Sequence, residues 1–170
     1  MNTRRASASY LRSFIFCVED SLVSTVGLLS GVAIAAVPPK TILLTGIVLV
    51  FVEAFSMAVG EFLAEESSEE YLAGPAPRPG SGQARQPLIA GSIMFTSYLV
   101  SGFVPLAPYV VLPVASAFWV SIALSLAALF ALGLIGARLA GTNLLKSGFR
   151  MLAIGGIAIV VGVVAGEFIA

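Results

Sequence analysis

Five long runs of apolar residues constrain this chain more than any other feature of its sequence. Each run reaches the roughly 20 residues that an α-helix needs to cross the hydrocarbon core of a bilayer. The runs are continuously apolar and do not alternate, which argues against the strands of a membrane β-barrel. We therefore expect an all-α integral membrane protein with one domain over residues 1–170, and spans at about 14–37, 41–64, 88–112, 114–136 and 151–170.

The charge content excludes most soluble functions. Charged residues make up 11% of the chain, whereas a soluble domain usually carries about 25%. Nine basic and nine acidic residues leave no positive field to hold nucleic acid. Histidine is absent and Cys17 is the only cysteine, so a common general base, an intrachain disulfide and a zinc finger are all excluded. We expect no enzyme activity, no cofactor and no nucleic-acid partner, with membrane lipid as the surroundings.

The basic residues predict how the chain sits in the membrane. Five spans place eight of the nine on the same side as the N-terminus, and only Lys40 on the other. Positive residues favour the cytoplasmic side, so we expect the N-terminus inside and the C-terminus outside, in a bacterial inner membrane. Residues 72–87, rich in Pro, Gly and Ala, are expected to form a cytoplasmic linker. Glu19 and Asp20 interrupt the first apolar run, which argues against a cleaved signal peptide.

Acidic side chains inside the spans are the main functional signal. A charged group in a membrane helix costs several kcal/mol, by disputed amounts, and by default indicates function. We expect no Lys or Arg at membrane depth, so the charge has to be met by protons, by a bound cation or by water. The residues concerned are Glu19, Asp20, Glu53, Glu61 and Glu167, of which Glu167 lies near the outer end and is expected to reach water.

The spacing of these acids predicts a cation path between the first two spans. Glu53, Met57 and Glu61 share one helix face, and the helical rise puts Met57 at about the depth of Asp20. Carboxylates with a thioether suit a weakly held, exchangeable divalent ion such as Fe²⁺ or Mn²⁺. Because desolvation favours a protonated carboxylate, such a group can alternate between proton and metal, as in an antiporter. Glu19 points about 100° away from Asp20 and is a weaker candidate ligand.

Other interpretations of these residues remain open. Asp20 and Glu53 can be protonated and hydrogen-bonded between helices, and Met57 alone is more often a packing residue. The run Glu65, Glu66, Glu69 and Glu70 is either a solvated helix end or a funnel that concentrates cations at the cytoplasmic mouth. The spacings Gly27 to Gly31 and Gly162 to Gly166 permit close contact between helices but do not identify the partner helix.

Four segments together resemble the vacuolar iron transporter family, including its nodulin-like branch. Residues 19–33 (EDSLVSTVGLLSGVA) are similar to the family's opening span, and residues 53–71 (EAFSMAVGEFLAEESSEEY) to its Ser-Met-x-x-Gly-Glu helix. Residues 102–113 (GFVPLAPYVVLP) match its Pro-Leu-x-Pro-Tyr segment, and residues 136–151 (GARLAGTNLLKSGFRM) resemble the stretch before its last span. The resemblance covers nearly the whole chain in order.

The resemblance implies a homodimer that exports Fe²⁺, and often Mn²⁺, from the cytosol in exchange for protons. The path would lie between subunits, with the family's aspartate at Asp20 and its methionine at Met57. This chain has Ser21 where the family usually has glycine. It has Leu49 where some members have a glutamate, with Glu53 one turn later. It also lacks the cytoplasmic metal-binding domain of many members.

We therefore expect a divalent-metal transporter. Two alternatives belong to other classes: a proton-coupled carrier of another small solute, and a non-transporting membrane subunit that binds a partner through its cytoplasmic loops. The prolines at 105 and 108 are expected to kink or end the third span near the outer face, because proline removes a backbone donor.

Overall fold

The computed structural model describes residues 3–73 and 85–169 and consists of five long helices. Within these two ranges the chain contains no strand. Every helix is long and apolar enough to cross a membrane, which confirms the predicted all-α membrane fold. The helices are α1 (Thr3–Ile34), α2 (Pro39–Ala73), α3 (Arg85–Val111), α4 (Val114–Ala140) and α5 (Leu144–Ile169).

Proline, glycine and asparagine set the helix boundaries. Pro39 opens α2, a position where its missing N–H and fixed φ are compatible with a helix. Gly141 ends α4 with a φ of 67°, in the left-handed region that favours glycine. The side chain of Asn143 then accepts a hydrogen bond from the Lys146 backbone N–H at 3.1 Å and caps α5. As a result α5 begins at Leu144, seven residues before the predicted span.

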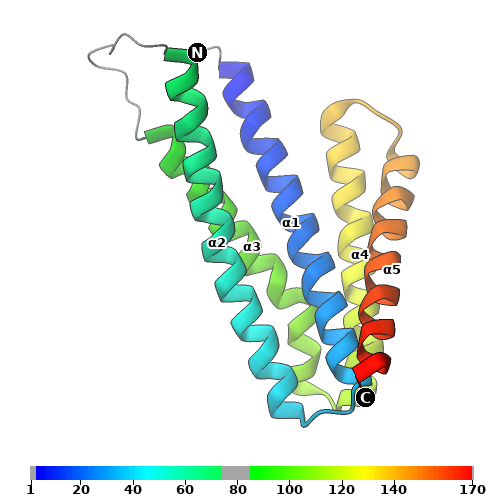
Figure 1. Ribbon diagram of the computed structural model, residues 1–170. Helices are drawn as coiled ribbons and strands as arrows, with labels where there is room; N and C mark the ends of the chain where they lie inside the picture. The colour runs from blue at the N-terminus through cyan, green and yellow to red at the C-terminus, as the bar shows by residue number, and fades with distance from the viewer. Residues whose placement is uncertain (1–2, 74–84, 170) are drawn as a thin grey trace.

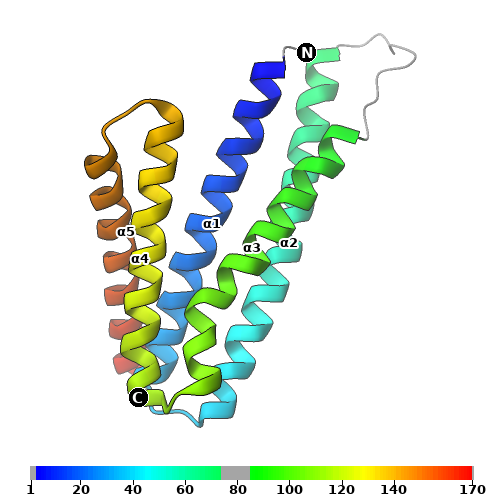
Figure 2. The same cartoon turned by 180° about the vertical axis from the view of Figure 1, so that it is seen from behind.

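Helix α1 lies between two helix pairs (Figure 1). On one side α2 packs along α3, and on the other α4 and α5 form a hairpin; the reverse view shows the same order (Figure 2). Helix α1 packs mainly on α5 and α3, and has much less contact with its neighbour in sequence, α2. The faces of α1 and α2 that carry the acids are therefore not sealed against each other.

Glycines join α1 to α5 within the chain. A Cβ atom on Gly31 would lie 2.5 Å from the carbonyl oxygen of Gly162. A Cβ on Gly162 or Gly166 would overlap the carbonyl oxygens of Gly27 and Gly31. Only hydrogen at these positions permits the two backbones to touch, so both predicted glycine pairs form one intrachain contact, the α1–α5 seam.

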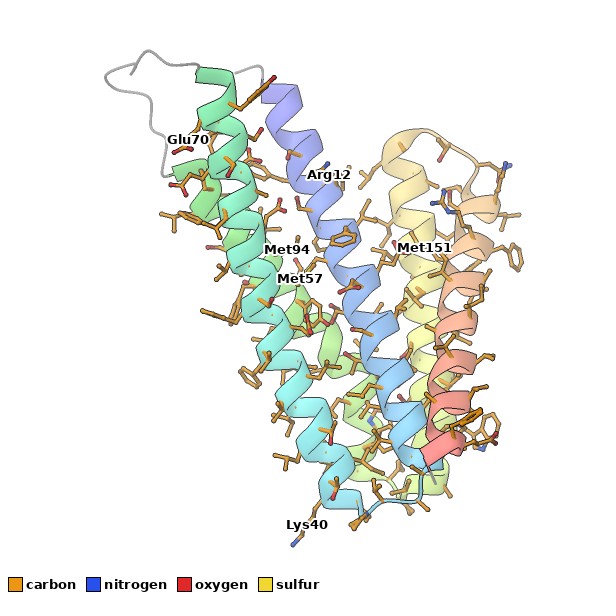
Figure 3. All side chains as sticks on the ribbon, in the orientation of Figure 1. Arg12, Lys40, Met57, Glu70, Met94 and Met151 are labelled. Atoms are coloured by element: carbon orange, nitrogen blue, oxygen red, sulfur yellow. The ribbon has the colours of Figure 1, made fainter. Side chains whose placement is uncertain are left out.

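The two ends of the bundle differ in charge. The first residues of α1 and the last of α5 lie at opposite ends (Figure 1). Arg12 and Glu70 lie at the end where α1 begins, and Lys40 lies at the other (Figure 3). This arrangement agrees with the charge asymmetry of the sequence, and which end faces the cytosol stays a prediction.

The structure refines two expectations about helix ends. Helix α3 continues through Pro105 and Pro108 and ends at Val111, so these prolines do not end it, and the alternative that they kink it stays a prediction. The hydroxyl of Ser121 on α4 donates to the Pro105 carbonyl at 2.7 Å, so a neighbouring helix supplies a hydrogen bond to the backbone of α3 at its prolines. The predicted linker is helical at its edges, since α2 runs to Ala73 and α3 starts at Arg85. Residues 74–84 lie outside the described ranges.

Candidate functional site

Asp20 on α1 and Glu53 on α2 form the centre of the candidate site. Both side chains are half-buried. A hydrogen bond of 2.5 Å between Ser13 and Glu61 fixes the register of these antiparallel helices. Counting inward from this bond, Asp20 is level with Ala54, next to Glu53.

Met57 lies closer than predicted to the end of the bundle where α1 begins. In the register set by the Ser13–Glu61 bond, Met57 is level with Cys17 and not with Asp20. The prediction assumed that the second span ends near residue 64, level with the start of the first span. In the structure Glu61 is already level with Ser13, beside Arg12. Met57 therefore lies about one turn from Asp20 along the path.

Helix α3 supplies the part of the site that the sequence analysis missed. Tyr98 is fully buried, and its hydroxyl lies 2.8 Å from the Ser24 hydroxyl, where either group is able to donate. The Ser21 hydroxyl on α1 donates to the Tyr98 carbonyl at 2.8 Å, and Ala54 on α2 lies in the same buried cluster as Tyr98, so three helices meet at this point. A tyrosine in the middle of an apolar span was the available signal, because a buried phenol usually finds a hydrogen-bond partner.

Three sulfur-containing side chains lie about one helical turn from Asp20, on the side toward the start of α1. Cys17, Ala54, Met94 and Tyr98 form a buried cluster, and Met57 packs against it. Met57 and Met94 are near neighbours halfway along the bundle (Figure 3). The Cys17 thiol donates a hydrogen bond to the Met94 carbonyl at 3.0 Å. Its single S–H is therefore already paired. Of these groups, Met57 is the one that remains partly exposed beside the acids.

A polar pocket of about 400 Å³ opens between α1 and α2 beyond Glu61. It is lined by Ser9, Arg12, Glu61, Ala64, Glu65 and Ser68. We call it the vestibule. Ser13 is buried just below it, where its hydroxyl donates to Glu61. Glu65 thus joins Glu61 at the mouth, whereas Glu66 and Glu70 point to the outside and are exposed.

The remaining acids lie apart from this path. Glu19 is half-buried on α1, one residue before Asp20. Arg150 is exposed on α5, which begins one and a half turns before it, and the expectation that no basic residue reaches membrane depth stays a prediction. Glu69 is half-buried on the extension of α2 near Glu65, and Glu167 is exposed at the far end of α5.

In one chain the centre of the site offers the carboxylates of Asp20 and Glu53 with nearby hydroxyl oxygens, and the Met57 thioether and the Glu61 carboxylate lie one and two turns away. Within the described ranges, no three residues of the types Asp, Glu, Cys and His come close enough together to hold a metal ion. Asp20, Glu53, Met57 and Glu61 are each half-buried. Such an open, sparse set of ligands can bind a divalent ion weakly and release it again.

The chain resembles known membrane proteins along most of its length. The sequence pattern of the VIT family matches residues 11–79 and 72–167. "Vacuolar iron transporter homolog 4" of Arabidopsis thaliana is 31% identical over 158 residues, which cover 88% of this chain and 78% of that protein. "Vacuolar iron transporter homolog 2" of Oryza sativa subsp. japonica is 27% identical over 167 residues, covering 92% and 88%. These relatives are plant proteins named for the vacuole, so they give no support to the expected bacterial inner membrane.

Proposed function

The chain belongs to the VIT family, and from this membership and the acidic path we propose that it transports divalent iron across a membrane, out of the cytosol. Its relatives are named as homologues of an iron transporter, which agrees with the expectation that the chain is not an enzyme. The observation that supports the proposal is the register of α1 and α2, which puts Asp20 level with the residue next to Glu53 in two helices that are apolar enough to cross a membrane.

The proposed ion path has two stages. A cation enters through the vestibule, passes Glu61 and Met57, and reaches Asp20 and Glu53 about two turns further in. The ligands are hard oxygens with one soft sulfur, which suits Fe²⁺ and also admits Mn²⁺. A carboxylate can hold either a metal ion or a proton, so the same groups can bind the two in turn. Proton antiport is therefore the proposed coupling.

We also propose that the transporter is a homodimer. Half-buried carboxylates at membrane depth are costly when they face lipid, and a second copy would shield them. An open apolar groove of about 600 Å³ runs along α1 and α5 beside Ser24, next to the site. A dimer that covers these surfaces would bring two sets of ligands together and raise the number of groups available to one ion.

Uptake by proteoliposomes tests the function directly. The vesicles contain a pH-sensitive dye and a metal-sensitive dye, and Fe²⁺ or Mn²⁺ is added outside under reducing conditions. We expect metal to enter and protons to leave together. Proton movement without any metal dependence would instead support a carrier of another solute. No flux at all from intact protein would support a non-transporting subunit.

Met57→Leu separates a ligand from a packing residue. Leucine keeps most of the volume, so the free energy of unfolding should change by less than about 1.5 kcal/mol. Loss of the sulfur should nevertheless reduce Fe²⁺ uptake by about tenfold at low metal concentration, the low end of the effects seen when a metal site loses a supporting group. The matched control is Met94→Leu, which replaces a buried methionine of the same cluster on α3. Equal uptake by both variants and the parent would assign Met57 to packing alone.

A further inference from the structure

We propose that the Ser13–Glu61 hydrogen bond is a latch that holds the Glu61 carboxylate away from an entering cation and opens when the cation binds. The inference rests on the proposed function and assigns a role to Ser13, which acts through Glu61 as a positioning residue. It is drawn from three features of the described residues: the partners of Ser13, its burial, and its place between the vestibule and the inner acids.

The Ser13 hydroxyl has two acceptors. It donates to the Glu61 carboxylate at 2.5 Å, and the carbonyl oxygen of Ser9 on its own helix lies 3.1 Å away. One hydroxyl carries a single proton, so it can fully satisfy only one of them at a time. When Glu61 leaves, the hydroxyl returns to Ser9 without losing its hydrogen bond. Opening the latch therefore leaves no buried donor unpaired, which keeps its cost low.

Burial makes the closed state well defined. The Ser13 side chain is 3% exposed, so water does not compete freely for its hydroxyl. Glu61 is half-buried and lines the vestibule, so an entering cation can reach it from that side. In the closed state part of the carboxylate's hydrogen-bonding capacity is used by Ser13, and a cation has to compete with that bond.

The latch lies at the boundary between the two stages of the path. Glu65, Ser68 and Arg12 lie on the vestibule side of the bond. Asp20 lies seven residues beyond Ser13 on α1, and Glu53 eight residues beyond Glu61 on α2, which corresponds to about 10–12 Å along the helices. A cation that moves from the vestibule toward this pair has to pass the bond that joins α1 to α2.

Ser13→Ala removes the latch and should make entry easier. We expect the KM for Mn²⁺ uptake by proteoliposomes to fall about fivefold, as expected when a competing hydrogen bond to a carboxylate is removed. The kcat should stay within about twofold of the parent, because the inner acids are unchanged. Ser13→Thr keeps the hydroxyl and should restore the parent KM. Ser67→Ala, which removes an exposed hydroxyl from the same helix as Glu61, outside the vestibule lining, is the matched control and should behave like the parent.

A rise in KM, or an unchanged KM in Ser13→Ala, overturns the latch while uptake by the parent keeps the proposed function intact. No uptake by the parent overturns the proposed function. The latch is then judged by a double-mutant cycle of thermal stability between Ser13→Ala and Glu61→Gln in the purified protein. We expect coupling between the two side chains in the absence of metal and its loss in saturating Mn²⁺; coupling that Mn²⁺ does not change overturns the latch.

Discussion

Asp20→Asn is expected to reduce metal uptake by at least about 100-fold, since removal of even an outer partner of a metal ligand typically costs 10–100-fold. Asparagine has nearly the same size and keeps an oxygen, so the change removes the charge and little else. Asp20 lies where α1, α2 and α3 meet: the next residue, Ser21, donates to the Tyr98 carbonyl, and Asp20 is level with the residue next to Glu53. Without its charge the site keeps one carboxylate, which is too little to attract a divalent ion from water. Initial uptake rates of Fe²⁺ and Mn²⁺ into proteoliposomes measure the effect.

Glu19→Gln is the matched control for Asp20→Asn. It removes the adjacent carboxylate on the same helix, which points about 100° away from Asp20 around the helix axis. We expect this variant to retain most of the parent's uptake. Equal losses in the two variants would mean that the first helix needs its negative charge in general. Full activity in Asp20→Asn would remove the centre of the proposed site.

Gly162→Val is expected to lower the free energy of unfolding by about 3 kcal/mol, at the upper end of the usual range for overpacking. A Cβ at this position would overlap the carbonyl oxygen of Gly27 on α1, and backbone cannot turn aside as a side chain can. The two helices would have to separate along the α1–α5 seam. Thermal unfolding of the protein purified in detergent, followed by helical circular dichroism, measures the loss.

Gly156→Ala is the control within the same helix. No atom lies within 4 Å of a Cβ added there, so alanine should fit without displacement. Alanine is also favoured over glycine in a helix by about 1 kcal/mol, so this variant should be as stable as the parent or slightly more stable. If Gly162→Val unfolded at the same temperature as Gly156→Ala, the seam would not be the close contact described above.

The fold could be predicted from the sequence because a membrane limits the choices so strongly. Each apolar run had to become a helix in which every backbone group is paired, and all five did. The helix ends were harder to predict. Helix α5 begins after its cap, Asn143, well before Arg150, and α2 continues through its acidic run to Ala73. Polar residues at helix ends are stabilised by capping hydrogen bonds and by water, and a hydropathy pattern contains neither.

Contacts between helices were the part that the sequence could not provide. The glycine spacings predicted a close approach, but only the structure identifies α5 as the partner of α1. Periodicity placed Glu53, Met57 and Glu61 on one face, yet the register between α1 and α2 depends on the Ser13–Glu61 bond. The contribution of Tyr98 and Met94 depends on where α3 packs, which a pattern along one helix does not contain.

The burial of Cys17 has a practical consequence for experiments on this chain. Its thiol is inaccessible to solvent and already donates a hydrogen bond, so a maleimide reagent should not modify it in the folded protein. Cysteines introduced singly at Lys40 and Lys146 would then be the reactive thiols, at opposite ends of the bundle. A membrane-impermeant reagent applied to one face of sealed vesicles would modify only one of them. The sidedness of the chain can thus be determined without first removing a native residue from the neighbourhood of the path.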